Sequence, residues 1–296
     1  MPRGLTSRAI PIAMATVVSN LHRVQPERLR AFILPREHGA WGILLIPLLT
    51  GASIGFMTGG GAFPLILFIA ASLSLFCLRT PVEVWLGAAA LRAQTPAERK
   101  ILFTSLVIYA ALAVVSVGWL LWAERATGLL LVGGTAAVFF LVQAGLKKSG
   151  RQMRMAAQLV GAMGLTSTAA GAYYVVTGLL NQTALLIWAA NWLLAANQIH
   201  FVQLRIHGAR AAGLREKLAR GKWFLAREAV TVLLLLGAWW GEVLPGLAAL
   251  AFLPILLRGS RWFLQAPAPL AIHRLGFSEL AHALAFGVLF TLAFLL

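Results

Sequence analysis

Residues 101–122, ILFTSLVIYAALAVVSVGWLLW, decide the fold class, because this stretch has no charged side chain over a length that can cross a bilayer. A helix that spans the hydrocarbon core needs about 20 mostly apolar residues. Other apolar runs of this kind lie at roughly 41–58, 62–78, 127–146, 155–180, 183–204, 224–241, 243–257 and 279–296. The sequence therefore predicts an all-α, polytopic membrane helical bundle with about nine transmembrane helices.

The composition of the chain agrees with a membrane location. Of its 296 residues, 60% are hydrophobic and only 11% are charged, and the mean hydropathy is +0.83. A soluble domain carries about 25% charged residues, so a soluble fold and a disordered chain are excluded. The single cysteine, Cys77, excludes a disulfide scaffold because it has no second cysteine to pair with.

The 25 basic residues alternate between the two sides of the predicted bundle. All except Arg125 lie before the first apolar run or in the connections after every second run, with Arg227 four residues into the run that follows such a connection. Because Lys and Arg stay cytoplasmic, this partition predicts a cytoplasmic N-terminus and an outside C-terminus. Residues 1–34 are predicted to be a cytoplasmic or interfacial arm, and residues 35–296 a single transmembrane bundle domain. Basic loops on the cytoplasmic side account for the net charge of +16. Because the membrane topology explains this charge, nucleic acid is excluded as a partner.

Polar residues inside a membrane or at its edge are costly and are functional candidates by default. The first group, Arg36, Glu37 and His38, follows Pro35 at the start of the first apolar run. Proline suits the first helical turn, the helix dipole favours a carboxylate there, and histidine titrates near neutral pH. This group has two interpretations of equal weight. It is either a well-formed helix start, or a functional site or structural ion-pair network.

The second group, Arg79 and Glu83, follows the second apolar run. These residues are four apart, which favours a pair on one helical face. Pro81 between them is expected to break or begin a helix, and the plainer interpretation of the group is a capped loop start. Glu98, in the same connection, is expected in a solvated loop.

The third group lies in the run 183–204 and directly after it. At about 100° per residue, one stripe of the predicted helix holds Asn197, His200, Gln203 and His207. A second stripe on the opposite side holds Asn191, Gln198 and Arg205. A helix with two polar stripes does not face lipid, so we expect it to be central or to line a cavity. A metal site here would need His38 and Glu37 as further ligands, and none is predicted.

The string PREHGAW at residues 35–41, followed by an apolar helix, resembles the opening of the YwiC-like family of bacterial integral membrane proteins. The resemblance covers roughly residues 34–51. It implies a multi-pass protein of the bacterial inner membrane. It supplies no reaction, because the biochemical function of the family is uncharacterised.

The layout of the chain, with polar segments after the second run and at the sixth, resembles the UbiA prenyltransferase superfamily and implies a UbiA-like bundle. In that superfamily, aspartate-rich motifs at these two places hold Mg²⁺ and an isoprenyl diphosphate. All nine acidic residues here are glutamates, so neither motif is present and no metal or other cofactor is expected. Arginine forks match phosphate oxygens, which leaves Arg36, Arg79 and Arg205 able to bind an anionic headgroup directly.

Three hypotheses for the function follow, and whether the protein is an enzyme stays open. The first is binding of, or action on, a lipid or isoprenoid with an anionic headgroup at the cytoplasmic leaflet. The alternatives are a non-catalytic membrane partner or assembly factor and a small-solute transporter. The expected partners are accordingly membrane lipids, an isoprenoid-like ligand or another membrane protein.

The candidate site combines the three polar groups. The candidate catalytic residues are Glu37, His38 and His200. The candidate substrate-binding residues are Arg36, Arg79, Glu83, Asn197, Gln203, Arg205 and His207. Because charged groups at the membrane edge must pair or reach water, we expect these side chains to converge on one cytoplasm-facing cavity.

Overall fold

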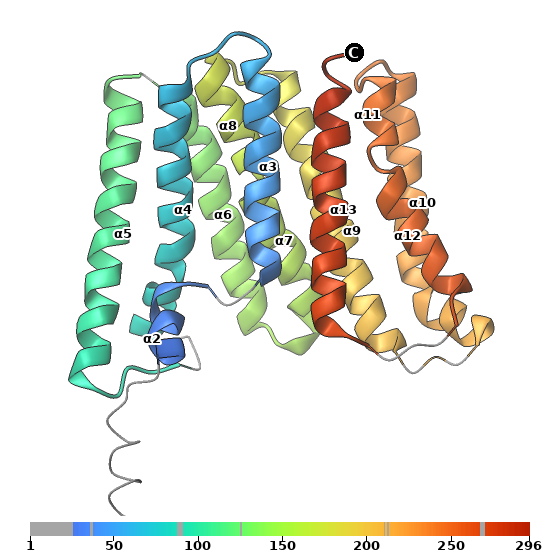
Figure 1. Ribbon diagram of the computed structural model, residues 1–296, viewed down its shortest axis with the longest axis horizontal. Helices are drawn as coiled ribbons and strands as arrows, with labels where there is room; N and C mark the ends of the chain where they lie inside the picture. The colour runs from blue at the N-terminus through green and yellow to red at the C-terminus, as the bar shows by residue number, and fades with distance from the viewer. Residues whose placement is uncertain are drawn as a thin grey trace, which may run out of the picture. The chain divides into compact units, whose positions relative to one another are not determined.

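The computed structural model describes residues 26–35, 38–87, 91–124, 126–209, 211, 213–266 and 270–296. All regular structure within these ranges is helical (Figure 1). Nine helical segments of the described residues are long and apolar enough to cross a membrane. The predicted all-α bundle is therefore confirmed, and the chain is a multi-pass membrane protein.

The chain divides into two compact units. The small unit consists of Met1–Arg36 and Ser74–Ala111, and the large unit of Glu37–Leu73 and Leu112–Leu296. The helices α4 (Ala62–Trp85) and α5 (Pro96–Trp122) contribute residues to both units. Residues 1–25 lie outside the described ranges, so the predicted arm over residues 1–34 stays a prediction.

The small unit contains α2 (Pro26–Ile33) together with its parts of α4 and α5. The other elements belong to the large unit. They are α3 (His38–Phe56), α6 (Gly128–Lys148), η1 (Arg151–Met153), α7 (Arg154–Thr166), α8 (Thr168–Thr177), α9 (Gln182–Gly208), α10 (Leu214–Trp240), α11 (Gly246–Leu250), α12 (Leu253–Leu264) and α13 (Ile272–Leu292).

The last two spans are longer than the sequence predicts. The eighth span, made of α11 and α12, covers Gly246–Leu264 and not 243–257, and α13 begins at Ile272 and not at residue 279. Arg258 therefore lies inside α12 and not in a connection. The physical reason is that Arg258 forms an ion pair with Glu279 of α13. A hydropathy rule places a charged residue outside the membrane, but a charge that is paired inside the bundle can lie within a span.

The helix α9 lies at the centre of the large unit, as its two polar stripes predict. It packs against α3, α7, α8, α10 and α13. Its residues Ile187 and Leu194 belong to a core that also contains Phe252, Phe286 and Phe290. The aromatic rings of α13 therefore fill the space beside α9.

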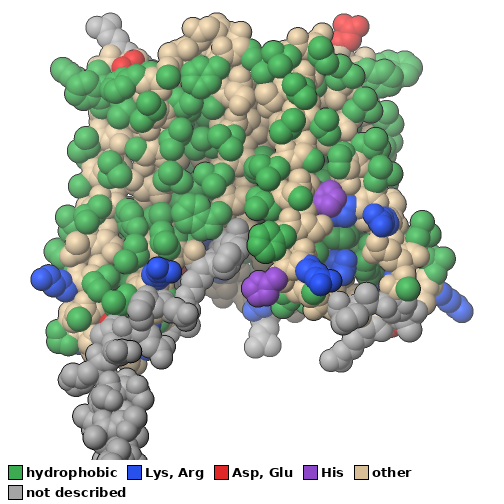
Figure 2. Space-filling view, in the orientation of Figure 1, with side chains coloured by type: hydrophobic (Ala, Val, Ile, Leu, Met, Phe, Trp, Pro, Cys, Tyr) green, Lys and Arg blue, Asp and Glu red, His purple; other side chains and the backbone are tan. Residues whose placement is uncertain are grey.

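Close approach between α3 and α8 depends on a glycine. A Cβ atom at Gly51 would lie 2.0 Å from the carbonyl oxygen of Ala169. In lipid, where the hydrophobic effect does not drive helices together, small residues allow this close packing. The outward faces are apolar (Figure 2), with Leu131 68% exposed on α6 and Leu233 67% exposed on α10, as a surface in contact with lipid requires.

The small unit corrects the expectation for Glu98, which is buried at the start of α5 and does not lie in a solvated loop. Its carboxylate accepts hydrogen bonds from Arg28 Nε at 2.6 Å and from the N–H groups of Gln94 and Thr95. The N–H of Glu98 in turn donates to Thr95 Oγ1 at 3.2 Å. This reciprocal pattern is a capping box, and it satisfies backbone donors that the first helical turn leaves unpaired.

Candidate functional site

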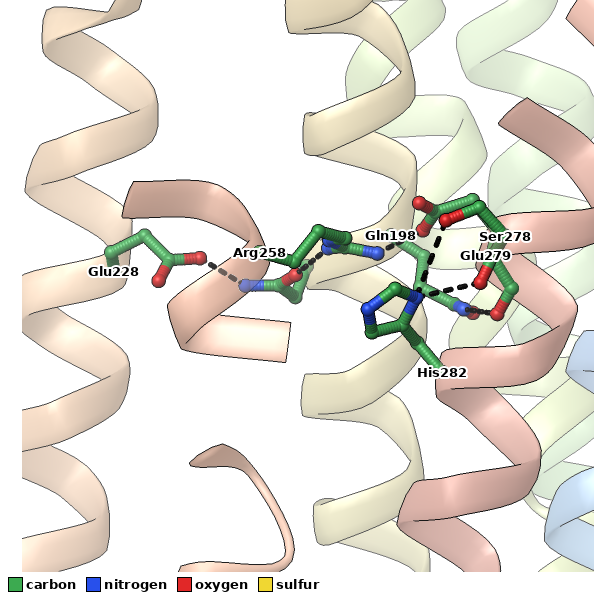
Figure 3. A network of polar contacts seen from close by, with 7 residues as sticks. Gln198, Glu228, Arg258, Ser278, Glu279 and His282 are labelled. Atoms are coloured by element: carbon green, nitrogen blue, oxygen red, sulfur yellow. Dashed lines mark hydrogen bonds and ion pairs between the residues drawn. The ribbon is translucent and has the colours of Figure 1, made fainter. Parts of the chain in front are cut away.

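A chain of buried and half-buried polar contacts, here called the polar network, connects four helices of the large unit. Its members are Asn197 of α9, Glu228 of α10, Arg258 of α12 and Glu279 of α13 (Figure 3). Arg258 Nη1 donates to Glu279 Oε2, and Arg258 Nη2 donates to Asn197 Oδ1 at 2.6 Å. Asn197 Nδ2 donates to Glu228 Oε1. The contacts thus run without interruption across the four helices.

Burial makes the ion pair at the centre of the network costly to break. Arg258 is only 9% exposed and Glu279 only 8% exposed. The guanidinium carbon of Arg258 also lies 4.0 Å from the centre of the Phe201 ring, close enough for a cation–π contact. Removing one partner from a buried ion pair leaves a charge without compensation. The two residues therefore depend on each other inside the bundle.

The network lies within the spans and not at their ends. At a rise of 1.5 Å per residue, Arg258 lies about 9 Å along α12 from its end at Leu264. Glu279 lies about 10 Å along α13 from its start at Ile272. Ionisable residues at this depth face the bundle interior, pair with one another and mark functional sites by default.

Two atoms of the network have no hydrogen-bond partner among the described residues. They are Arg258 Nε, a donor, and Glu279 Oε1, an acceptor, and both are buried. Around them, Gln198 Nε2 donates to the carbonyl oxygen of Glu279 at 2.7 Å, and His282 Nδ1 lies 2.6 Å from the carbonyl oxygen of Ser278. Buried polar groups are nearly always paired, so the network keeps hydrogen-bonding capacity that its own members do not use.

The other predicted residues of α9 divide between contacts within the helix and contacts to its neighbours. His200 is buried, and its Nε2 atom has no partner among the described residues. Gln203 Nε2 lies 3.4 Å from Gln158 Oε1 of α7, and the carbonyl oxygen of Gln203 lies 2.8 Å from His207 Nδ1. The Arg205 guanidinium lies 6.0 Å from the centre of the Phe201 ring. Of the predicted stripe, only Asn197 joins the polar network.

The predicted pairing of Arg79 with Glu83 is confirmed within the small unit, where Arg79 Nε lies 2.8 Å from Glu83 Oε1. Pro81 does not break or begin a helix, contrary to expectation, because α4 continues through it to Trp85. Membrane helices tolerate proline where neighbouring groups satisfy the freed backbone carbonyl. Arg36 and Glu37 lie outside the described residues, so the convergence of all three groups on one cavity stays a prediction.

The comparison with known families bears on the first half of the chain. The YwiC-like protein family matches residues 34–173. Over this segment the chain is similar to the YwiC-like family. The resemblance predicted from PREHGAW is therefore confirmed, and the YwiC-like segment extends from four residues before α3 into α8. No curated protein and no solved structure matches the chain.

The polar network lies beyond the YwiC-like segment, because α9, α10, α12 and α13 all follow residue 173. The sequence prediction included Asn197 but missed Glu228, Arg258 and Glu279. A signal was available, because Glu228 and Glu279 are acidic residues within predicted apolar runs. An acid in such a run is by itself a functional candidate.

Metal ligands do not gather in the part of the chain that the structure describes. Within it, no group of three His, Cys, Asp or Glu side chains is placed to hold a metal ion. A set that included Glu37 lies outside that part. The described side chains of the polar network carry two carboxylates, an amide and a guanidinium, and these groups suit hydrogen bonding and charge pairing.

Proposed function

We propose that this YwiC-like membrane protein binds a lipid or isoprenoid with an anionic headgroup at the cytoplasmic leaflet. The observation that supports this proposal is a group of cations at one end of the large unit. The end of α9, the end of α12 and the start of α13 lie together at that end (Figure 1). Arg205, Arg261 and Arg274 occupy these three positions.

The balance of charge at this end favours an anion. Lys, Arg and His side chains gather there on the α12–α13 side of the large unit (Figure 2). Arg205 forms no ion pair with any described residue, although its charge acts on the nearby Glu279 carboxylate. Arginine presents a planar fork that matches phosphate oxygens. The positive-inside rule places this end at the cytoplasmic leaflet.

Apolar side chains beside these cations favour an amphiphile over a free anion. Leu264 at the end of α12 is 81% exposed, and Ile272 and Phe277 near the start of α13 are 73% and 74% exposed. A hydrocarbon chain lying against these side chains would leave its headgroup next to Arg205 and Arg274. Glu37, His38 and His200 are the residues to test for a reaction on the bound headgroup.

The test is ligand-induced thermal stabilisation of the purified full-length protein in neutral detergent. Farnesyl phosphate is the probe, with uncharged farnesol and inorganic phosphate as separate controls. A hydrogen bond to a charged group contributes about 1.5–3 kcal/mol, so Arg205→Gln should weaken farnesyl phosphate binding about tenfold or more. Arg154→Gln, an exposed arginine at the start of α7, is the matched control and should leave binding unchanged.

Because the chain has no aspartate, binding should also survive chelation of Mg²⁺. Equal stabilisation by farnesol would refute recognition of the headgroup, and equal stabilisation by inorganic phosphate would refute an amphiphilic ligand. An equal loss of binding in Arg154→Gln would show that the position of Arg205 has no special role.

A further inference from the structure

We infer that the Glu228 carboxyl group is a proton-binding site inside the bundle, where it takes up and releases one proton while Asn197 stays hydrogen-bonded to it. The inference goes beyond the proposed headgroup site. It rests on the geometry of the polar network and holds whether or not a lipid binds.

The first step is that two carboxyl groups share one guanidinium. Glu279 takes the direct ion pair with Arg258. Glu228 forms no ion pair with any described residue and receives a hydrogen bond from the neutral amide of Asn197. A carboxylate inside a bundle without a directly paired cation is unfavourable. A proton is the smallest group that neutralises it.

The second step is that Arg258 fixes the orientation of the Asn197 side-chain amide. Its Oδ1 atom accepts from Arg258, which can only donate. The Nδ2 group must therefore face Glu228 and donate to Oε1. A proton added to Glu228 then resides on Oε2, because Oε1 has to remain an acceptor. The carboxylate and the proton combine to a carboxylic acid, and no other bond of the network breaks.

The third step is that the neighbouring titratable groups are poorer proton acceptors. Protonating Glu279 would disrupt its pair with Arg258. A second ring proton on His200 would lie on Nε2, a buried atom with no described partner to accept it. Glu228 is only half-buried, so its carboxyl group is not sealed inside the bundle.

The groups that face or flank Glu228 are known from each helix packed against α10. They are Arg258 on α12 with Glu279 of α13 behind it, Arg227 on α10 itself, and His200 on α9, which lies near Arg227. The helix α11 contributes no titratable side chain. Arg227 is exposed, and consecutive residues of a helix do not face each other. The hydrogen bond from Asn197 is therefore the direct contact that holds the Glu228 carboxyl group in place.

The experiment is infrared difference spectroscopy of the full-length protein in lipid nanodiscs during a pH titration, in H₂O and in D₂O. A carbonyl stretch of a protonated carboxylic acid should appear on acidification, shift in D₂O, and disappear in Glu228→Gln. Glu216→Gln is the matched control, because Glu216 lies in the first turn of the same helix with its side chain 41% exposed. This variant should keep the band.

Asn197→Ala keeps the test decisive if Glu228→Gln fails to fold. That variant removes the hydrogen bond to Oε1, so the band should persist at a higher carbonyl frequency. The inference is overturned if no pH-dependent band distinguishes the wild type from Glu228→Gln. A band that survives in Glu228→Gln and is lost in Glu279→Gln would equally overturn it, because the proton would then belong to Glu279.

Discussion

Replacing Arg258 with methionine removes the cation from the centre of the polar network. Glu279, 8% exposed, would then be left with a buried charge and without its direct ion-pair partner, and Asn197 Oδ1 would lose its donor. Breaking a buried ion pair costs about 3–5 kcal/mol in proteins. The unfolded state of a membrane protein finds other polar partners, so we expect a loss of about 3 kcal/mol, which is roughly a hundredfold shift in the folding equilibrium.

The assay is reversible unfolding by sodium dodecyl sulfate in mixed micelles, followed by circular dichroism. The matched control is Arg220→Met, which breaks an ion pair with Glu216 whose side chains are 42% and 41% exposed. Exposed pairs four residues apart contribute about 0.3–0.5 kcal/mol, so this variant should unfold almost as the wild type does.

A double variant separates the charge from the packing. In Arg258→Met combined with Glu279→Gln, no unpaired charge remains, so most of the lost stability should return. The reasoning is refuted if Arg258→Met costs no more than Arg220→Met, or if the double variant is as unstable as the sum of the two single changes. Either result would mean that the buried pair does not act as a unit.

Three further predictions follow from other parts of the molecule. Gly51→Val should abolish the folded state, because its Cβ would lie 2.0 Å from a backbone oxygen of α8, and the yield of monodisperse protein measures this. Glu98→Ala should destabilise the small unit by about 1 kcal/mol, because it removes the capping box. The modification rate of the buried thiol of Cys77 should then rise. Reporters fused after Leu296 and inserted at residues 209–213 should report opposite sides of the membrane, because α10 to α13 lie between them.

Each of these predictions has a control or a contrary outcome. Gly118→Ala, with no atom within 4 Å of its added Cβ, should be tolerated, and a folded Gly51→Val would contradict the close packing of α3 on α8. Glu83→Gln breaks a more exposed pair in the same unit and should leave the thiol of Cys77 protected. Two reporters on the same side would refute the alternation of the spans.

The residues before α9 show how far local sequence information reaches. PREHGAW identified the YwiC-like family, and the match covers residues 34–173. The capping box at Thr95 and Glu98 also has a readable signature, since a Thr three residues before a Glu with Pro between them marks a helix start. It nevertheless escaped the prediction, because the partner Arg28 lies far away in the sequence and a lone Glu beside basic residues resembles a solvated loop.

The polar network needed the tertiary structure. Periodicity placed Asn197 on a polar stripe of a central helix, and the structure confirms that position. Nothing local shows that Arg258, 61 residues away, donates to Asn197, or that Glu279 neutralises Arg258. A hydropathy rule ends a span at a charge because it treats each charge as unpaired.

The sequence by itself determined that the chain crosses a membrane many times and that α9 is central. These properties follow from apolar length and from the spacing of polar side chains, and both act over one helix. The tertiary structure decided which charges lie inside the bundle, because a buried charge is tolerated only when a partner from another helix meets it. The extension of α12 to Leu264 and the start of α13 at Ile272 follow from that one pairing.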